Sequence, residues 1–324
     1  MAKTMPRLLI LLTLPKDVRD YYAAKLGERF PELTIDVVDH HSKAAPFMSS
    51  ADILVTFGPM LKDDVFRDAP NLRWIQALGT GVDGITDQPS LSPSVVVTNI
   101  RGIHGAPVSE AALMSMLALS RDLPRGLRCQ SEQSWTRFPA KLLDGKTVGI
   151  FGVGLIAEAL APKCKAFGMT VVGFSSTQRE VVGIDRMYLR GELIARAGEL
   201  DYLVLLVPYA EDTRLLIDAR VFAAMKPTSY LVNLARGGVV DEDALIKALK
   251  DKTILSAGLD VFADEPKVPQ ELMDMENVVL LPHVGSASHA TRRAMDELVA
   301  NNIISWFAGK GPITPVPETP PKKP

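Results

Sequence analysis

Three polar side chains, far apart along the chain, have the types that hydride transfer to a ketone requires. His283 lies in LPHVGSA, Glu265 in DVFADEP and Arg236 in NLARGG, each after an apolar run typical of a β-strand. A histidine can protonate the carbonyl oxygen, because it exchanges protons near neutral pH. A carboxylate on its far ring nitrogen would orient the ring and favour its protonated form. An arginine can hold a carboxylate with two parallel hydrogen bonds.

Taken singly, these residues have ordinary alternatives. Arg236 could form a surface ion pair, Glu265 could be a solvated loop acid, and His283 could be a capped turn residue. In an open parallel α/β sheet, however, ligands bind just beyond the carboxyl ends of the strands. The three together therefore predict one catalytic cluster. No grouping of His, Cys and Asp has the spacing of metal ligands, so no metal is expected.

The element that would position this cluster is the stretch KTVGIFGVGLIAEALA at 146–161. An apolar strand pattern precedes Gly152, and a helical pattern begins at Leu155. A turn of this kind brings backbone N–H groups and the positive end of a helix to a pyrophosphate. Gly152 permits the tight turn, Gly154 permits close approach of the phosphates, and Ala157 replaces the third glycine. The stretch predicts dinucleotide binding.

The segment after the next expected strand bears on which dinucleotide binds. A carboxylate there would accept hydrogen bonds from the ribose 2′-OH of NAD. The sequence instead continues Ser175-Ser176-Thr177 and reaches Arg179, with no carboxylate before Glu180. Hydroxyls and a guanidinium favour a 2′-phosphate. We therefore expect NADP(H) to be preferred, with NAD(H) possible; the alternative is a merely polar loop with weak selectivity.

Strand and helix patterns alternate along the chain, which predicts an α/β fold with parallel sheets. Before residue 100 the expected strands are 8–12, 33–38, 53–57, 72–77 and 95–98, with a helix at 16–27. After the glycine stretch the expected strands are 170–174, 202–207, 229–233, 255–259 and 278–281, with helices at 155–167, 218–225, 241–250 and 287–307. A largely apolar helix is expected over AALMSMLALSRDL at 111–123, with Pro107 and Glu110 near its start. The segment 121–135 is either a dimerisation arm or a surface connection. The Pro-rich tail from 311 is expected to be extended or disordered.

Between two of the early strands lies Leu78-Gly79-Thr80-Gly81. Two glycines around a threonine, just past a strand, can turn consecutive N–H groups outward into an anion-binding nest. The alternative is an ordinary turn from strand to helix.

Composition excludes several classes of protein. The 324 residues are 47% hydrophobic with a net charge of −2, so neither disorder nor nucleic-acid binding is expected. Cys129 and Cys164 are far apart in sequence and are expected to be reduced thiols in a cytoplasmic protein. The apolar run at 8–14 is too short to span a bilayer and lacks a cleavage site, so no membrane contact is expected. His40 and His41 are expected to be solvated.

Several ordered motifs resemble those of the D-isomer-specific 2-hydroxyacid dehydrogenase family over nearly the whole chain. They are GTGVD at 79–83, HGAPVSEAAL at 104–113, GIFGVGLIA at 149–157, LVPYAEDTRLLID at 206–218, NLARGGVVDEDAL at 233–245, GLDVFADEP at 258–266 and LPHVGSA at 281–287. The resemblance implies that His283 is the acid/base, Glu265 its partner and Arg236 the substrate anchor.

The same resemblance implies the remaining site residues. Leu78, Gly79, Thr80 and Gly81 would bind the substrate together with Arg236 and His283. The implied cofactor site is Gly152, Gly154, Leu155, Ile156, Ser175, Ser176, Thr177, Arg179, Val207, Pro208, Thr213, Leu234, Ala235, Arg236, Asp260, His283 and Gly285. Within it, Asp260 would hold the nicotinamide carboxamide, and Val207 with Pro208 would form a wall beside the cofactor.

The family fold has two Rossmann-like domains, one flavodoxin-like and one dinucleotide-binding, with parallel sheets and an interdomain cleft. The implied substrate-binding domain is 1–102 with 288–324, the implied dinucleotide-binding domain is 103–287, and members are usually homodimers joined through the latter. The expected activity is NADP(H)-dependent reduction of a small 2-keto acid, similar to glyoxylate or hydroxypyruvate, to the D-2-hydroxy acid. The alternatives are an NAD-dependent D-2-hydroxyacid or phosphoglycerate dehydrogenase, and a non-catalytic dinucleotide-sensing protein similar to a corepressor.

Overall fold

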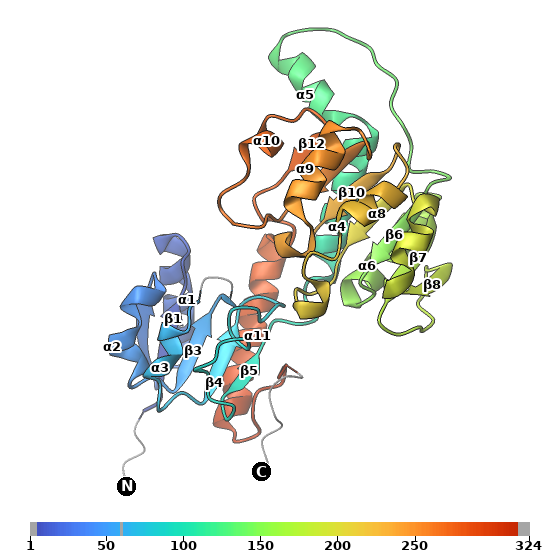
Figure 1. Cartoon of the computed structure of the whole chain (residues 1–324). Helices are drawn as coiled ribbons and strands as arrows, with labels where there is room; N and C mark the ends of the chain where they lie inside the picture. Colours follow the sequence, from blue (N-terminus) through green and yellow to red (C-terminus); the bar gives the residue numbers. More distant parts are fainter. Residues whose placement is uncertain (1–4, 59–60, 317–324) are drawn as a thin grey trace. The chain divides into compact units, whose positions relative to one another are not determined.

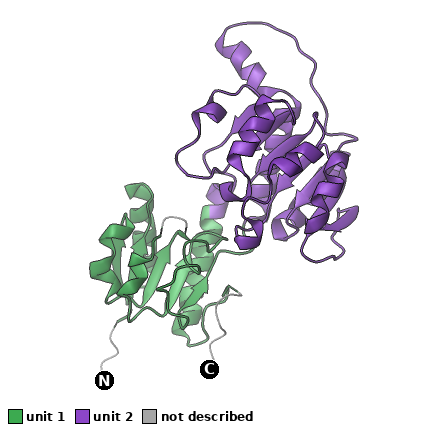
Figure 2. Ribbon diagram, in the orientation of Figure 1, with its two compact units in different colours: residues 1–103, 292–324 green, residues 104–291 purple. Residues whose placement is uncertain are grey.

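The computed structural model describes residues 5–58 and 61–316, which form two compact units (Figures 1 and 2). One unit comprises Met1–Ile103 with Arg292–Pro324, and the other comprises His104–Thr291. Each contains a parallel sheet, so the predicted fold class of two Rossmann-like α/β domains is confirmed. The roles expected for 1–102 with 288–324 and for 103–287 stay predictions. The last part of the expected tail, from 317, lies outside the described residues.

The first unit has a five-stranded sheet in the order β2-β1-β3-β4-β5 (Figure 1). Its strands are β1 (Arg7–Leu11), β2 (Thr34–Val38), β3 (Ile53–Thr56), β4 (Trp74–Ala77) and β5 (Val96–Thr98). Its helices are α1 (Lys16–Arg29), α2 (Ala45–Met48), α3 (Asp64–Arg67) and most of α11 (His289–Phe307), with a 3₁₀ turn at His41–Lys43.

Successive residues of β1 enter different hydrophobic clusters. Leu9 and Leu11 pack in the cluster that includes residues of α2 and α3, whereas Leu8 and Ile10 pack with residues of α1 and with Ile303 of α11. A parallel strand covered by helices on both faces must be apolar at successive positions. This is why the strand has an unbroken apolar run instead of an alternating pattern.

The second unit has a seven-stranded sheet in the order β12-β11-β10-β9-β6-β7-β8. Its strands are β6 (Thr147–Phe151), β7 (Thr170–Ser175), β8 (Arg186–Leu189), β9 (Tyr202–Leu205), β10 (Tyr230–Asn233), β11 (Ser256–Leu259) and β12 (Val278–Leu280). Its helices are α4 (Gly105–Ser120), α5 (Leu123–Ser131), α6 (Leu155–Ala166), α7 (Leu193–Arg196), α8 (Ala219–Ala224), α9 (Glu242–Lys250) and α10 (Gln270–Met273). Short 3₁₀ turns lie at Arg190–Glu192, Ala197–Glu199, Glu211–Thr213 and Gly237–Val239.

The order of the second sheet reverses beside β6. From β6 the chain adds β7 and β8 on one side, and then crosses to β9 on the other. The carboxyl ends of β6 and β9 therefore flank a topological switch point, which is where ligands bind in sheets of this kind.

Four elements of the second unit were not expected from the sequence: β8, α5, α7 and α10. Helices α7 and α10 have only four residues each, too few to show a helical period. Strand β8 has four residues at the edge of the sheet, all at least partly exposed, so its apolar signal is weak. Helix α5 occupies part of the 121–135 segment, but it has no buried residue. Hydrophobic periodicity finds elements that bury a face, and β8 and α5 bury very little.

Candidate active site

The loops that carry the expected site residues follow neighbouring strands of the second sheet. Strand β6 ends before Gly152 and β9 before Val207; Arg236 follows β10, Glu265 follows β11 and His283 follows β12. Because all these strands are parallel, their carboxyl ends lie at one edge of the sheet. The topology thus places five loops in a row.

The glycine turn after β6 has the geometry that phosphate binding requires. Gly152 has φ = 103°, and a Cβ atom there would lie 2.7 Å from the backbone nitrogen of Val207, so only glycine fits. Gly154 is the N-cap of α6 without a side-chain cap, and a Cβ there would meet no atom within 4 Å. The first N–H groups of a helix have no partner within the helix, so those of α6, at Leu155 and Ile156, stay predicted donors to a pyrophosphate. Ala157 is fully buried, as close packing of helix on strand requires.

His283 and Glu265 form a direct hydrogen bond. The Nδ1 atom of His283 lies 2.7 Å from Oε2 of Glu265, while the Phe262 N–H donates to Oε1 at 3.0 Å. Burial alone would raise the pKa of the Glu265 carboxyl, but the hydrogen bonds from His283 and Phe262 outweigh it and hold that pKa below its usual value. Glu265 is therefore ionised at neutral pH, and it fixes which ring nitrogen of His283 faces outward.

Asp260 holds the backbone that carries His283. Its two carboxylate oxygens accept the N–H groups of Val284 and Gly285, each at 2.8 Å, and its carbonyl oxygen accepts the His283 N–H at 2.9 Å. His283 has φ = 55°, a left-handed conformation that a non-glycine residue adopts only when its surroundings impose it. Burial raises the pKa of Asp260 above its usual value. The expected contact of Asp260 with the carboxamide stays a prediction, and the structure adds this positioning role.

Arg236 lies at the end of the tight turn that follows β10. The Asn233 side chain closes this turn by donating to the Arg236 carbonyl at 3.1 Å and accepting from the Ala235 N–H at 3.0 Å. His104 is close enough to Arg236 that, after burial, the positive charge of Arg236 further lowers the pKa of His104. No role was expected for His104, because its only signal in the sequence is its place within the motif HGAPVSEAAL.

Several of the residues expected around the cofactor are buried in the second unit. Thr213 is fully buried and donates to the Pro208 carbonyl at 2.8 Å, so it shapes the loop after β9. Ala235 and Val207 are also buried. Leu234 lies at the place where a Cβ on Gly285 would point, 3.3 Å from it.

The segment after β7 presents Ser176 and Thr177 to solvent. Arg179 of the same segment reaches back to the glycine turn, where its Nη2 atom donates to the Val153 carbonyl at 3.2 Å and to Oε1 of Glu158 at 2.6 Å. Sequence reasoning missed Glu158, because it considered only carboxylates that follow the second strand. The fold brings this acid in from α6.

In the first unit, the turn Leu78–Gly81 follows β4. The Leu78 N–H donates to the Thr56 carbonyl at 2.8 Å, Gly79 is buried and Thr80 is exposed. The glycine with a positive φ in this region is Gly84, at 80°, and not Gly79 or Gly81. The turn therefore lacks the left-handed glycine that a nest would have at these two positions.

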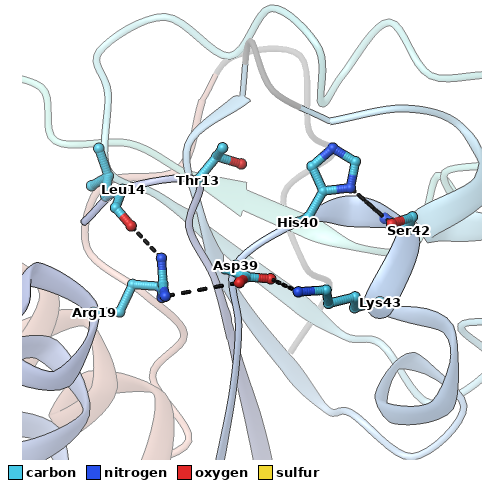
Figure 3. Close-up of a pocket in the computed structure, with 7 residues that line it drawn as sticks. All are labelled: Thr13, Leu14, Arg19, Asp39, His40, Ser42 and Lys43. Atoms are coloured by element: carbon cyan, nitrogen blue, oxygen red, sulfur yellow. Dashed lines mark hydrogen bonds and ion pairs between the residues drawn. The ribbon is translucent and has the colours of Figure 1, made fainter. Parts of the chain in front are cut away.

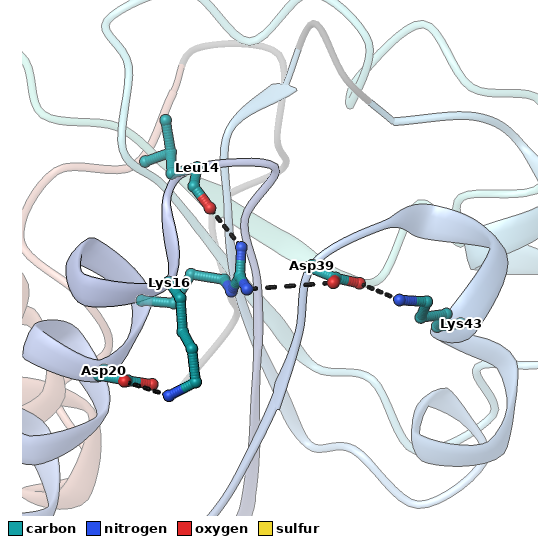
Figure 4. Close-up of polar contacts among 6 residues, drawn as sticks. Leu14, Lys16, Asp20, Asp39 and Lys43 are labelled. Atoms are coloured by element: carbon teal, nitrogen blue, oxygen red, sulfur yellow. Dashed lines mark hydrogen bonds and ion pairs between the residues drawn. The ribbon is translucent and has the colours of Figure 1, made fainter.

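A hollow of about 430 Å³ lies at the carboxyl ends of β1 and β2 in the same unit (Figure 3). Asp39 pairs there with Arg19 at 3.9 Å (Figure 3) and with Lys43 at 2.7 Å (Figure 4). The bond from Lys43 holds the pKa of Asp39 below its usual value. His40 is exposed and bonds to the Ser42 hydroxyl at 2.8 Å. The charges in this hollow satisfy one another, as in ordinary surface ion pairs.

Two negative findings apply to residues 5–58 and 61–316. Within these ranges no three or more His, Cys, Asp or Glu residues group as metal ligands would. Nor does any helix there combine the length and apolarity needed to cross a membrane.

A glycine turn that opens a helix at the switch point, and a histidine–carboxylate pair on the same edge of the sheet, define a dinucleotide-dependent oxidoreductase. A family model described as "D-isomer specific 2-hydroxyacid dehydrogenase, NAD binding domain" matches residues 113–285. Glyoxylate reductase of Pyrococcus horikoshii is 36% identical over 277 residues, which cover 82% of this chain and 83% of that relative. Glyoxylate/hydroxypyruvate reductase A of Arabidopsis thaliana is 37% identical over 255 residues, 78% of this chain and 80% of that one.

Solved structures of this family are also similar to this chain. The NADPH-dependent glyoxylate/hydroxypyruvate reductase of Sinorhizobium meliloti, in complex with NADP and malonate, matches with a TM-score of 0.87 and 32% identity over 99% of both chains. The chain belongs to the D-isomer-specific 2-hydroxyacid dehydrogenase family and is an NAD(P)-dependent dehydrogenase that acts on small keto or hydroxy acids.

Proposed function

We propose that this protein reduces a small 2-keto acid, of the glyoxylate or hydroxypyruvate type, to the D-2-hydroxy acid with NADPH. The observation that carries the proposal is the 2.7 Å bond between His283 and Glu265, on loops that follow adjacent strands of the dinucleotide-binding sheet. The relatives named as glyoxylate reductases, and the similar structure that contains NADP and malonate, support the substrate class and the cofactor.

The chain's own residues account for the proton and for orientation. When bound, the nicotinamide supplies the hydride to the carbonyl carbon. His283, held at Nδ1 by Glu265, directs Nε2 to the carbonyl oxygen and transfers its proton there as the C=O electron pair becomes an O–H bond. The ionised Glu265 stabilises the imidazolium before the transfer. Arg236 holds the substrate carboxylate, which orients the carbonyl for the proton transfer from His283. The turn Leu78–Gly81 is the proposed backbone donor to a substrate carboxylate in the first unit.

Replacement of Glu265 by glutamine tests the pairing. The amide of the new side chain can still accept a hydrogen bond from Nδ1, but it carries no charge, so the ion pair that holds the proton used in reduction is lost. We expect the active range for reduction to narrow toward acid, measured as kcat/KM against pH. A profile that superposes on the wild-type profile would show that the carboxylate does not assist His283.

The proposed preference for NADPH rests on Arg179. Both of its hydrogen bonds use Nη2, and Nε and Nη1 have no partner among the described residues, so these donors are available to a 2′-phosphate. Glu158 shares the guanidinium and opposes the phosphate charge, which tempers the preference. We expect Arg179→Met to raise KM for NADPH roughly tenfold while KM for NADH changes little.

The matched control for this variant is Arg196→Met. Arg196 also pairs with a glutamate, Glu199 at 3.0 Å, but it lies in α7, away from the glycine turn. Its loss should leave both KM values unchanged. Equal effects on NADPH and NADH in Arg179→Met would argue that Arg179 does not read the 2′-phosphate.

The experiment that tests the function itself is NADPH oxidation, followed by absorbance, with glyoxylate, hydroxypyruvate, pyruvate and phenylpyruvate, repeated with NADH. We expect the first two substrates and NADPH to give the highest kcat/KM. Absence of turnover with all four acids and both cofactors would refute the proposal and favour a protein that only senses dinucleotides.

We also propose that the protein is a cytoplasmic homodimer joined through the second unit. The segment around α5 exposes Leu123, Leu127, Trp135 and Leu142, and Trp135 is 95% exposed. Apolar side chains gathered on one projecting segment are typical of a surface that another subunit covers. Light scattering should give twice the chain mass, and a monomeric mass at micromolar concentration would contradict the proposal.

A further inference from the structure

The carbonyl oxygens of the Leu78–Gly81 turn are held by the end of β5. The Ile100 N–H donates to the Gly79 carbonyl at 3.3 Å, and the Nδ2 atom of Asn99 donates to the Thr80 carbonyl at 2.7 Å. Two successive carbonyl groups of the turn are thus drawn toward the same strand end.

This anchoring fixes the direction of the neighbouring N–H groups. In a planar trans peptide, the C=O and the N–H point in opposite directions. The Gly79 carbonyl shares its peptide with the Thr80 N–H, and the Thr80 carbonyl shares its peptide with the Gly81 N–H. Both N–H groups therefore point away from β5. The turn therefore presents two N–H groups on the side away from β5, without a left-handed glycine at either position.

Both the side chain and the backbone of Asn99 are hydrogen-bonded. It is 8% exposed, its Oδ1 atom accepts the Arg101 N–H at 3.2 Å, and its carbonyl accepts the Thr314 hydroxyl at 2.8 Å. The side-chain orientation follows from its partners, since the Thr80 carbonyl can only accept and the Arg101 N–H can only donate.

The contact continues into α11 through a buried network. Nδ2 of Asn302, a fully buried residue of α11, donates to the Thr314 hydroxyl at 2.9 Å and to Gln76 of β4 at 2.8 Å. Its Oδ1 atom accepts the Ile313 N–H at 2.7 Å. The segment around Thr314 also pairs with β5, through the Thr98–Pro315 bridge. A chain of satisfied polar groups thus runs from α11 to the turn, and such networks specify a single arrangement.

We infer that Asn99 is a positioning residue for substrate binding: with Thr314 and Asn302 behind it, it aims the Thr80 and Gly81 N–H groups at the substrate carboxylate. The inference rests on the proposed function, because it takes the turn to be the carboxylate cradle. Asn99 does not touch the reacting atoms. It acts by preventing the two peptide planes of the turn from rotating.

The decisive variant is Asn99→Asp, which keeps the side-chain shape and the acceptor for Arg101 but replaces the donor to Thr80 with a carboxylate oxygen. We expect KM for glyoxylate to rise roughly tenfold, with kcat and KM for NADPH within about twofold of wild type. The dissociation constant of oxalate, a non-reactive dicarboxylate, should rise by a similar factor in calorimetry with NADPH present. A merely structural role would change kcat and both KM values together.

Two further variants complete the test. Asn71→Asp is the matched control. Asn71 also donates from Nδ2 to a backbone carbonyl, that of Ser49 at 2.9 Å, but it lies before the amino end of β4, whereas the turn Leu78–Gly81 follows the carboxyl end. The Asn71→Asp variant should bind oxalate like the wild type. Thr314→Val, which removes the hydroxyl at nearly constant volume, should weaken oxalate binding severalfold. It also keeps the inference testable if Asn99→Asp does not fold.

The outcomes separate the inference from the function. If the wild type reduces glyoxylate but Asn99→Asp or Thr314→Val keeps its KM and oxalate affinity, the inference is wrong and the function stands. If the wild type binds oxalate and Asn99→Asp weakens that binding, but the wild type reduces no keto acid, the proposed function is wrong and the positioning role stands. If the wild type neither reduces keto acids nor binds oxalate, both are overturned.

Discussion

Replacement of His283 by alanine is expected to lower kcat for keto-acid reduction by roughly 10²–10⁴ while leaving NADPH binding almost unchanged. The imidazole is the group whose proton the carbonyl oxygen receives, and alanine removes it without touching the glycine turn. Glu265 would then lose one of the two hydrogen bonds that hold its pKa below the usual value. Stopped-flow measurement of the hydride step, together with fluorescence titration of NADPH, gives both quantities.

Two further variants serve as controls for His283→Ala, one for backbone strain at position 283 and one for the loss of a histidine elsewhere. His283 has φ = 55°, and asparagine adopts that conformation more readily than alanine does, so His283→Asn tests the loss of the ring with less backbone strain. His289→Ala removes an exposed histidine from the first turn of α11 and should leave kcat unchanged. Turnover at the wild-type rate in His283→Asn would remove His283 from the mechanism.

Replacement of Gly237 by alanine is expected to lower kcat/KM by roughly 10²-fold, because it strikes the contact between the loops that carry Arg236 and Glu265. A Cβ on Gly237 would lie 1.9 Å from the carbonyl carbon of Phe262 and 2.0 Å from its oxygen. These are backbone atoms, which cannot rotate away as a side chain can. Phe262 also donates its N–H to Glu265, so the shift would reach the acid/base pair.

The matched control is the next residue. A Cβ on Gly238 would meet only ring atoms of Tyr209, the nearest at 2.7 Å, and that half-exposed side chain can move. Gly238→Ala should therefore cost much less activity than Gly237→Ala, and circular dichroism should show that both variants fold. Equal activities in the two variants would show that the contact with Phe262 does not set the geometry of the site.

Much of the fold could be predicted because it depends on local patterns. Strand β1 is an unbroken apolar run since both of its faces are covered, and the glycine turn is recognisable since Gly152 must have a positive φ beside Val207. The elements that escaped prediction either bury little, as β8 and α5 do, or are as short as the four-residue helices α2, α3, α7 and α10. A weak burial requirement leaves a weak sequence pattern.

In the candidate site, too, the features encoded in short segments could be predicted, and the contacts between distant segments could not. Arg236, Glu265 and His283 could be singled out because their chemical types and their places after expected strands are written in the sequence. Nothing local indicates that Glu158 of α6 reaches Arg179, at 2.6 Å. The reason is physical: such a contact joins two segments whose separation in space depends on the packing of a helix against a sheet.

The class of fold, the dinucleotide turn and the residue types available for hydride transfer follow from the order of amino acids, because periodicity, glycine conformation and side-chain chemistry are properties of short segments. The contacts by which Asp260 fixes the backbone of His283 and Asn99 holds the Thr80 carbonyl arise in the folded chain alone. A hydrogen bond needs its two atoms within about 3 Å of each other. For residues far apart along the chain, only the folded packing can set that distance.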